Sequence, residues 1–275
     1  MDAPCEAPAG PAIARIIAVF AHLPPLPDMT LLTLAWLLPV IAATSLVSGV
    51  FGMAGGMILM AVLVGAMPVA AAMVLHGVTQ MAANGGRALL WRQRIAWPIL
   101  GAYSVGLLAA LGLFGLLRYV PDRGVVLISL GLLPFVALAV PPRYAPQADR
   151  PVGAFVCGVL NGAVQMLAGV SGPLLDVFFV RSRMDRRDVV ATKAACQTLA
   201  HATKLVYFAA FAGAWHSDTV EFWVLPLAIA AAFWGTHLSR TLLERMSDVG
   251  FRRWTRRIIM AIGVVCLAQG VAAYL

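Results

Sequence analysis

The sequence predicts an all-α polytopic membrane protein built from two homologous four-segment halves. Hydrophobic residues make up 61% of the 275 residues and charged residues only 12%. Apolar segments long enough to cross a bilayer recur along the chain, and polar residues inside two of them repeat in the same order. A composition this apolar excludes an ordinary soluble domain, since a soluble domain needs a polar surface.

The chain divides into a tail and eight apolar segments. The N-terminal tail, 1–29, holds several prolines and one apolar run that is too short to cross a membrane. The segments are 31–65, 70–91, 96–117, 124–140, 152–180, 189–213, 221–239 and 256–275. Two of them, 31–65 and 152–180, exceed the roughly 20 residues of one straight span. Both contain glycine interruptions, so each is predicted to be a broken helix or a re-entrant hairpin.

An ungapped alignment of the two halves matches their intramembrane polar residues. The aligned pairs are Gly52 with Gly169, Gly55 with Gly172, Gly56 with Pro173, His76 with Lys193, Gln80 with Gln197, Asn84 with His201 and Arg87 with Lys204. Polar residues are rare inside apolar helices, so this coincidence indicates a fused duplication. The predicted repeats are 30–142 and 151–275.

The arginines favour inverted over parallel repeats. If each broken segment crosses the membrane once, the arginines of 92–94 and 143–150 lie outside. If each broken segment returns to its own side, these arginines move inside and the halves become inverted, as in many secondary transporters. The second arrangement places more arginines inside. Both arrangements put loops 181–188 and 240–257 in the cytoplasm and both termini outside.

A polar stripe runs along one face of the helix that follows each break. The first consists of His76, Gln80, Asn84 and Arg87, and the second of Lys193, Gln197, His201 and Lys204. Spacings of i, i+4, i+8 and i+11 put such residues on one narrow helix face. Lipid cannot satisfy their hydrogen bonds, so each stripe is expected to face the protein interior, and the two to face one another.

The breaks themselves predict an anion site. A helix that restarts at Gly55 or Gly172 leaves its first N–H groups unpaired and its positive dipole end within the membrane. That arrangement binds anions. Glycine permits a sharp turn and close approach of a ligand, Pro173 suits a first helical turn, and Ser171 is placed to cap the helix or contact a substrate.

The stretch Gly49-Val50-Phe51-Gly52-Met53-Ala54-Gly55-Gly56, followed by a polar helix and repeated in degenerate form at 169–173, resembles the TauE/SafE sulfite exporter family, also called the toluene sulfonate uptake permease group. The resemblance covers about 31–275. It implies a secondary transporter of small sulfur-containing oxyanions, such as sulfite, sulfoacetate or other organosulfonates, often working as an exporter. It also implies an integral protein of a plasma membrane, the inner membrane in bacteria.

The residues and the resemblance together define the expected site. Substrate contacts are expected from Gly55, Gly56, Gln80, Asn84, Ser171, Gly172, Lys193, Gln197, His201 and Lys204. The candidates to carry a coupled proton are His76, His201 and Asp176. The expected partners are a small anion, membrane lipid and a proton, and an oligomer is compatible with the sequence. No metal, organic cofactor or nucleic acid is implied, because the cysteines lack C-x-x-C spacing and the basic residues cluster between spans.

Other interpretations stay open at this level. Histidines and glutamines also serve as contacts between packed helices, Arg87 could extend to the membrane surface, and Asn161 and Gln165 are typical packing residues. The run Gly169-Val170-Ser171-Gly172 also fits a rhomboid-like intramembrane serine protease with His201 or His237 as base. Against this, the residue aligned with Ser171 is Ala54. A membrane sensor or partner subunit without transport is a third alternative.

Overall fold

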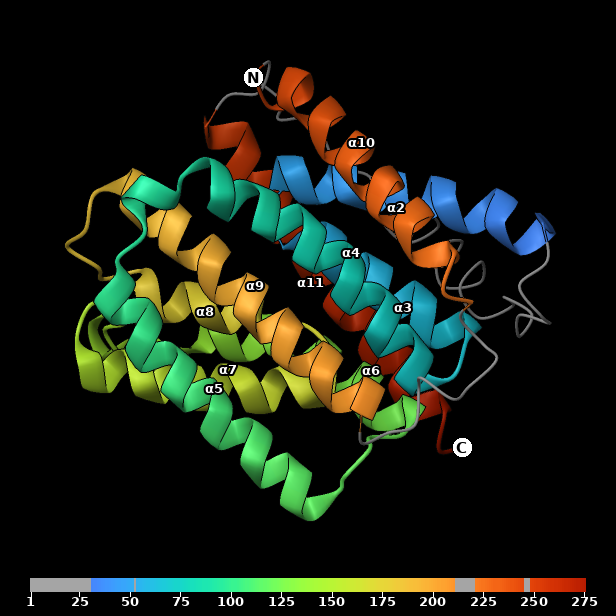
Figure 1. The fold of residues 1–275 in the computed structure, drawn as a ribbon, viewed down its shortest axis with the longest axis horizontal. Coiled ribbons are helices and arrows are strands. Elements are labelled where there is room, and N and C mark those ends of the chain that lie inside the picture. The colour runs from blue at the N-terminus through green and yellow to red at the C-terminus, as the bar shows by residue number, and fades with distance from the viewer. Residues whose placement is uncertain (1–30, 52, 211–220, 245–247) are drawn as a thin grey trace, which may run out of the picture.

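The computed structural model describes residues 31–51, 53–210, 221–244 and 248–275, and the predicted tail 1–29 lies outside this range. The described residues form ten α-helices and no strand, which confirms the all-helical prediction (Figure 1). The helices are α2 (Leu31–Phe51), α3 (Ala54–Ala66), α4 (Val69–Leu90), α5 (Trp97–Leu117), α6 (Arg123–Ala139), α7 (Pro151–Ala168), α8 (Gly172–Phe179), α9 (Arg186–Ala210), α10 (Val224–Glu244) and α11 (Asp248–Ala272).

Both long segments are broken as predicted. The first divides into α2 and α3, and the second into α7 and α8. α7 ends at Gly169, whose φ of 71° lies in the left-handed region that favours glycine. A Cβ placed on Gly55 would lie 1.9 Å from the Thr44 carbonyl oxygen, so the start of α3 folds back closely against α2.

The connection 240–257 between two apolar segments is mostly helical where the chain is described. α10 continues to Glu244 and α11 already begins at Asp248. Hydropathy marks where a segment can contact lipid, whereas a helix extends beyond that limit wherever good helix-forming residues continue. The side of the membrane on which this region lies stays a prediction.

The packing of the helices follows the repeat. The alignment makes α2 to α6 equivalent to α7 to α11, in order. α2 packs most extensively on α10, and its equivalent α7 packs on α5. α4 packs on its own equivalent α9, and α6 packs on α11. Helices of the two predicted repeats therefore pack on one another, with α4 and α9 side by side near the centre of the molecule (Figure 1).

The central pair of helices is antiparallel. Gly77 of α4 faces the His201 carbonyl and Leu205 of α9, whereas Gly85, farther along α4, faces the earlier residue Thr198. Residue numbers thus fall along α9 as they rise along α4, and Figure 1 shows the two helices running in opposite directions. These two helices, which the sequence alignment pairs, therefore point opposite ways.

The basic loops gather at one end of the molecule. An ion pair joins Arg94 to Asp188 at 3.5 Å, and the Arg181 guanidinium donates a 2.7 Å hydrogen bond to the Arg143 carbonyl. Loops 91–95, 141–150 and 181–187 are consequently neighbours. The turn that contains Tyr119 lies at the opposite end, where its carbonyl accepts a 2.8 Å hydrogen bond from Tyr207, near the end of α9.

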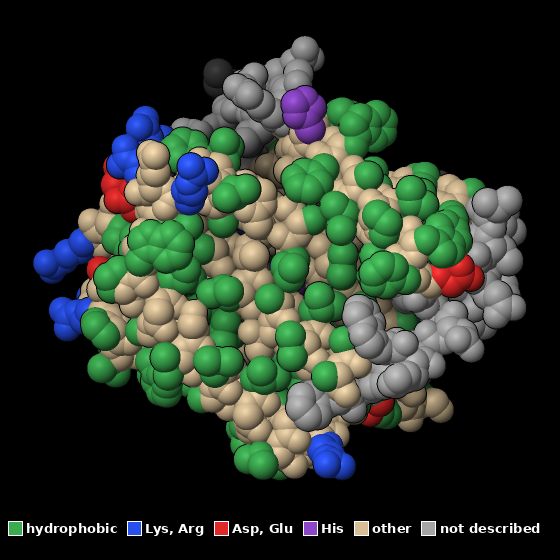
Figure 2. Space-filling model, in the orientation of Figure 1, with side chains coloured by type: hydrophobic (Ala, Val, Ile, Leu, Met, Phe, Trp, Pro, Cys, Tyr) green, Lys and Arg blue, Asp and Glu red, His purple; other side chains and the backbone are tan. Residues whose placement is uncertain are grey.

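The surface is typical of a protein surrounded by lipid. Within the described residues, four helical stretches are long and apolar enough to cross a membrane: Thr33–Phe51, Trp97–Leu117, Pro151–Ala168 and Trp254–Ala272. α4 and α9 are as long but carry the polar stripes. Figure 2 shows hydrophobic side chains spread across the visible face, with Lys and Arg gathered mainly at one edge. Large apolar side chains such as Leu108, Leu116 and Trp234 are exposed, as lipid contact requires.

Candidate functional site

Two short helices begin inside the protein without a side-chain cap. α3 begins after Met53 and α8 begins after Ser171, and neither N-cap residue makes a side-chain hydrogen bond to the helix start. Gly56 and Gly172 are buried at these two helix starts. Because the first N–H groups of a helix have no intrahelical partner, each start presents hydrogen-bond donors and a partial positive charge to its surroundings.

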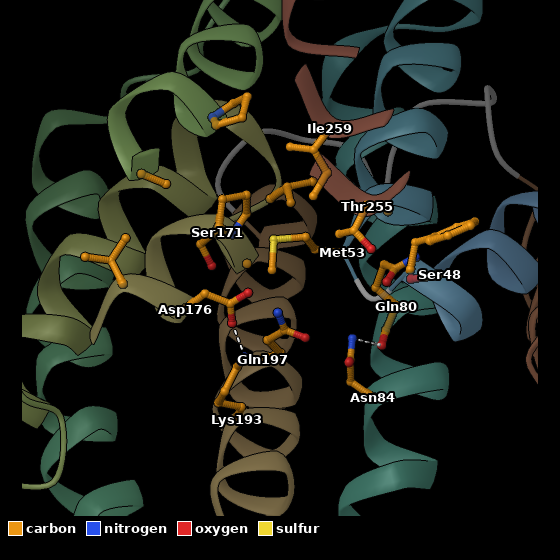
Figure 3. Close-up of a pocket in the computed structure, with 18 of the residues that line it drawn as sticks. Ser48, Met53, Gln80, Asn84, Ser171, Asp176, Lys193, Gln197, Thr255 and Ile259 are labelled. Carbon is orange, nitrogen blue, oxygen red and sulfur yellow. Dashed lines mark hydrogen bonds and ion pairs between the residues drawn. The ribbon is translucent and has the colours of Figure 1, made fainter. Parts of the chain in front are cut away.

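A cavity of about 810 Å³ lies where the two helix starts meet the two polar stripes. Its wall is formed by parts of α2, α3, α4, α6, α8, α9 and α11. The residues foreseen as site residues that line it are Gly56, His76, Gln80, Asn84, Ser171, Gly172, Asp176, Lys193, Gln197 and His201. Figure 3 shows Gln197 on α9 and Asn84 on α4 pointing toward one another across this space. Most of the site residues expected from the sequence therefore line this cavity.

Two residues expected to contact substrate lie elsewhere. Gly55 is buried against the backbone of α2, and Lys204 is fully buried behind the cavity wall. Arg87 lines the cavity near the end of α4. Asn161 donates a 3.0 Å hydrogen bond to the Cys157 carbonyl of the same helix, α7.

Each glutamine of the stripes lies against the helix start of its own half. The Gln80 amide carbon lies 3.4 Å from the position that a Cβ on Gly56 would take, and Gln197 Nε2 lies 3.0 Å from the corresponding position on Gly172. The backbone carbonyl of Gln80 accepts a 2.9 Å hydrogen bond from the Asn84 side chain, one turn along the same helix. Gln80 Nε2, by contrast, is buried without a hydrogen-bond partner. A buried donor without a partner is costly unless a ligand satisfies it.

The charged side chains of the cavity are mostly cationic. Arg87, Lys193 and Arg256 line it, and Asp176 is the acidic residue of the wall. Asp176 forms an ion pair with Lys193, shown by the dashed line in Figure 3. Val180 and Val190 are exposed lining residues next to the basic loop 181–187, so the cavity reaches the surface at the basic end of the molecule.

Behind this wall, buried groups connect the two halves. The Lys204 ammonium lies 2.9 Å from His76 Nδ1 and 3.0 Å from the Gly169 carbonyl oxygen. His76 Nε2 lies 2.9 Å from the Gly56 carbonyl oxygen. Gln165 Nε2 lies 2.8 Å from His201 Nδ1 and 3.2 Å from the Gly169 carbonyl oxygen. Both helix breaks are therefore joined to the polar stripes through hydrogen bonds.

Some wall residues escaped the sequence analysis. Ser48 lies on α2, Met53 at the first break, and Thr255 and Arg256 on α11. Met53 lies within the quoted glycine motif, which could have suggested it. Ser48, Thr255 and Arg256 carry no spacing signal, because they approach the cavity only through the packing of α2 and α11 against the rest of the bundle.

The protease alternative finds no dyad in this geometry. Among the described residues, neither histidine proposed as base hydrogen-bonds Ser171, because His201 Nδ1 contacts Gln165 and His237 is exposed on α10 outside the cavity wall. A serine nucleophile needs its base within hydrogen-bond reach. Within the described ranges, no group of three His, Cys, Asp or Glu residues is arranged to hold a metal ion.

A family model described as "Sulfite exporter TauE/SafE" matches residues 37–266. The match includes both helix breaks, both polar stripes and the whole cavity wall. No curated protein and no solved structure matches the chain.

Proposed function

Because the chain belongs to the TauE/SafE sulfite exporter family, a family of integral membrane transporters, we propose that its central cavity binds a small sulfur-containing oxyanion and carries it across the membrane by alternating access. Sulfite, sulfoacetate and other organosulfonates are the candidate substrates, and export is the proposed direction.

One observation carries this proposal. Two uncapped helix starts, one from each half, meet two glutamines and several cationic side chains in a single cavity. The oxygen atoms of a sulfite or sulfonate group accept several hydrogen bonds at once, and its negative charge is favoured at the N-terminus of a helix. The unpartnered Gln80 Nε2 would donate one of these bonds.

The proposed arrangement is an inverted repeat. Equivalent helices related by an axis along the membrane normal would run parallel, whereas α4 and α9 are antiparallel neighbours. The contacts that bring loops 91–95, 141–150 and 181–187 together support the same conclusion, since the positive-inside rule then assigns all three to the cytoplasm.

This orientation makes the structure an inward-facing state. The cavity reaches the surface beside the basic loops, so an anion would enter from the cytoplasm and contact the helix starts at the inner end of the cavity. Alternating access would then close this entrance and open a path on the other side of α3 and α8.

The test is anion flux in proteoliposomes, measured for sulfite, sulfoacetate, taurine and sulfate. Wild type should show saturable transport of sulfite or a sulfonate, and Gln80→Ala and Gln197→Ala should each weaken apparent affinity by roughly tenfold, as expected for lost hydrogen bonds to a charged group. Gln269→Ala is the matched control, because this glutamine of α11 does not line the cavity and its Nε2 has no partner. Failure of all four anions to move would refute the proposal.

A further inference from the structure

The Lys204 side chain is the most unusual buried group in the described part of the chain. None of its surface is exposed, it does not line the cavity, and neither of the ion pairs found among the described residues includes it. Its contacts are a histidine nitrogen and a backbone carbonyl. A lysine buried in a membrane protein without an acidic partner is costly and indicates a function.

The hydrogen bonds define how many protons this site can hold. The Gly56 carbonyl only accepts, so His76 Nε2 must carry a hydrogen to bond it. In neutral His76 the other nitrogen, Nδ1, then accepts from the Lys204 amine. The pair holds one ionising proton, on the amine or on the imidazole. A second would place two positive charges 2.9 Å apart in a buried site.

Few other ionisable groups surround the pair. The His201 ring centroid lies 5.4 Å from that of His76, and its Nδ1 accepts from the Gln165 amide, so a neutral His201 carries its hydrogen on Nε2. The titratable or charged groups on the elements around α9 include His76 and Arg87 from α4, Tyr103 from α5, Cys157 from α7, Asp176 from α8 and Arg94 from the loop after α4. Asp176 is paired with Lys193 of α9, and the end of α7 contributes Gln165 and the Gly169 carbonyl.

We infer that Lys204 and His76 form the proton-binding site of the transporter, and that the proton bound there is carried together with the anion. The inference rests on the proposed function for the anion. It assigns Lys204 to proton binding, whereas the sequence analysis expected this lysine to contact the substrate directly. His76 lines the cavity and Lys204 does not, so protons reach the lysine through the histidine ring.

The position of the pair explains how the two ligands are coupled. Its hydrogen bonds reach Gly56 at the start of α3 and Gly169 at the end of α7, so loss of the proton removes a positive charge that is hydrogen-bonded to both helix breaks. A positive charge just behind the anion site also favours the anion, and by linkage the anion favours the proton to the same extent. Proton and anion therefore travel in the same direction.

The site also makes sodium unnecessary. In transporters with broken helices, freed carbonyl groups often coordinate a coupling Na⁺. Here the carbonyl at the end of α7 contacts the Lys204 ammonium instead. We expect transport to be unchanged when Na⁺ is replaced by K⁺ on both sides of the membrane.

The first experiment uses wild-type protein. Sulfite or the best transported sulfonate is added to purified protein in weakly buffered detergent solution containing a pH indicator, and the same anion gradient is imposed on proteoliposomes with the indicator inside. Proton uptake on binding should be at most about one per anion, because the pair holds one proton. The liposome interior should acidify as the anion enters.

The variants are Lys204→Gln, His76→Gln and, as a matched control, Lys193→Gln. The first two should lose coupled proton movement and the pH dependence of anion affinity, while His76→Gln keeps an N–H donor for Gly56. Lys193→Gln removes a cavity cation and should weaken anion binding, yet retain proton uptake. If Lys204→Gln cannot be purified, the comparison of coupled proton movement in wild type and His76→Gln still tests the inference.

Saturable anion flux without proton movement in wild type would overturn the inference and leave the proposed function intact. Retained coupling in Lys204→Gln or His76→Gln would likewise overturn it. Absence of any anion flux would instead refute the proposed function, so the two failures are distinguishable.

Discussion

The two halves share one architecture and differ in the chemistry they place in it. In the first half His76 is fully buried, and Arg87 lies near the end of its helix beside the cavity. In the second half the aligned residues have the opposite locations: Lys193 is half-buried beside Asp176, and Lys204 is fully buried. An antiparallel pair of stripes thus becomes asymmetric in charge, with the buried lysine and the acidic residue both supplied by the second half.

The helix starts differ in the same way. Gly55 packs against backbone atoms of α2, whereas a Cβ on its equivalent, Gly172, would meet the side chains of Met53 and Gln197. A backbone neighbour cannot move aside, while a flexible side chain can. The first break is therefore fixed by packing, and the second lies open to the cavity. This difference suggests four experiments.

The largest effect is expected from adding one methyl group at the first break. Gly55→Ala places a carbon 1.9 Å from the Thr44 carbonyl oxygen, so α2 and α3 must separate, at a cost of about 3 kcal/mol or more. Gly172→Ala should cost less, about 1–2 kcal/mol, because the added carbon meets the Met53 Cβ at 2.9 Å and the movable end of Gln197 at 3.0 Å rather than backbone atoms. The measurement is thermal unfolding in detergent. Gly101→Ala is the control, since nothing lies within 4 Å of its added carbon. Equal destabilisation at both breaks would contradict the comparison.

A smaller effect is expected from the acidic residue of the second half. Asp176→Asn leaves the Lys193 charge uncompensated, so anion affinity should rise about fivefold, equivalent to about 1 kcal/mol for a partly exposed pair. The gain should shrink as salt concentration rises. Titration of the anion at two ionic strengths measures this. Asp188→Asn breaks the Arg94 ion pair outside the cavity and should leave affinity unchanged. A fall in affinity for Asp176→Asn would show that the carboxylate assists binding.

Replacing Ser171 tests whether its hydroxyl contributes to anion binding at the second break. The first break has no hydroxyl at the aligned position, Ala54. Ser171→Ala creates the residue found at the aligned position, Ala54, and should weaken anion affinity only about threefold, as expected for one neutral hydrogen bond. Flux measurements beside wild type check this. Complete loss of flux in a folded protein would contradict this expectation and make the Ser171 hydroxyl essential for transport.

The smallest effect concerns the contact that joins the two halves at the far end of the bundle. Asp122 accepts hydrogen bonds from the Val125 backbone N–H and the Tyr274 hydroxyl, and these bonds lower its pKa below the ordinary value. A carboxyl group with a lowered folded-state pKa stabilises the fold above its unfolded-state pKa. That contribution is lost as pH falls through the folded-state pKa.

The melting temperature of wild type should therefore fall slightly more than that of Asp122→Asn as the pH drops below about 4. The group is exposed, so the difference should be small. If the melting temperatures of the two proteins fall equally with pH, the Asp122 contact does not contribute to the pH dependence of stability.

The sequence was informative wherever polarity stood out against an apolar background. The glycine breaks and the stripes that contain Gln80 and Gln197 could be identified because intramembrane polar residues are rare, and helical spacing puts each stripe on one face. The start of α11 could not be identified, because helix propensity continues past the edge of an apolar span.

The sequence also could not predict that Lys204 is fully buried. Its alignment with Arg87 suggested equal roles, but depth along a helix depends on how the antiparallel neighbour is placed. Thr255 and Arg256 reach the cavity through tertiary packing of α11, for which no local pattern exists.

The interleaving of the halves has a consequence for biosynthesis. α2 is the first described helix to leave the ribosome, yet its main packing partner, α10, is among the last. The breaks therefore reach their final geometry only when translation is nearly complete, and lipid or an insertion factor must cover the α10-facing side of α2 until then. Under the proposed inverted repeat, a gene encoding one half alone would produce a subunit whose missing contacts only a second copy inserted in the opposite orientation could supply.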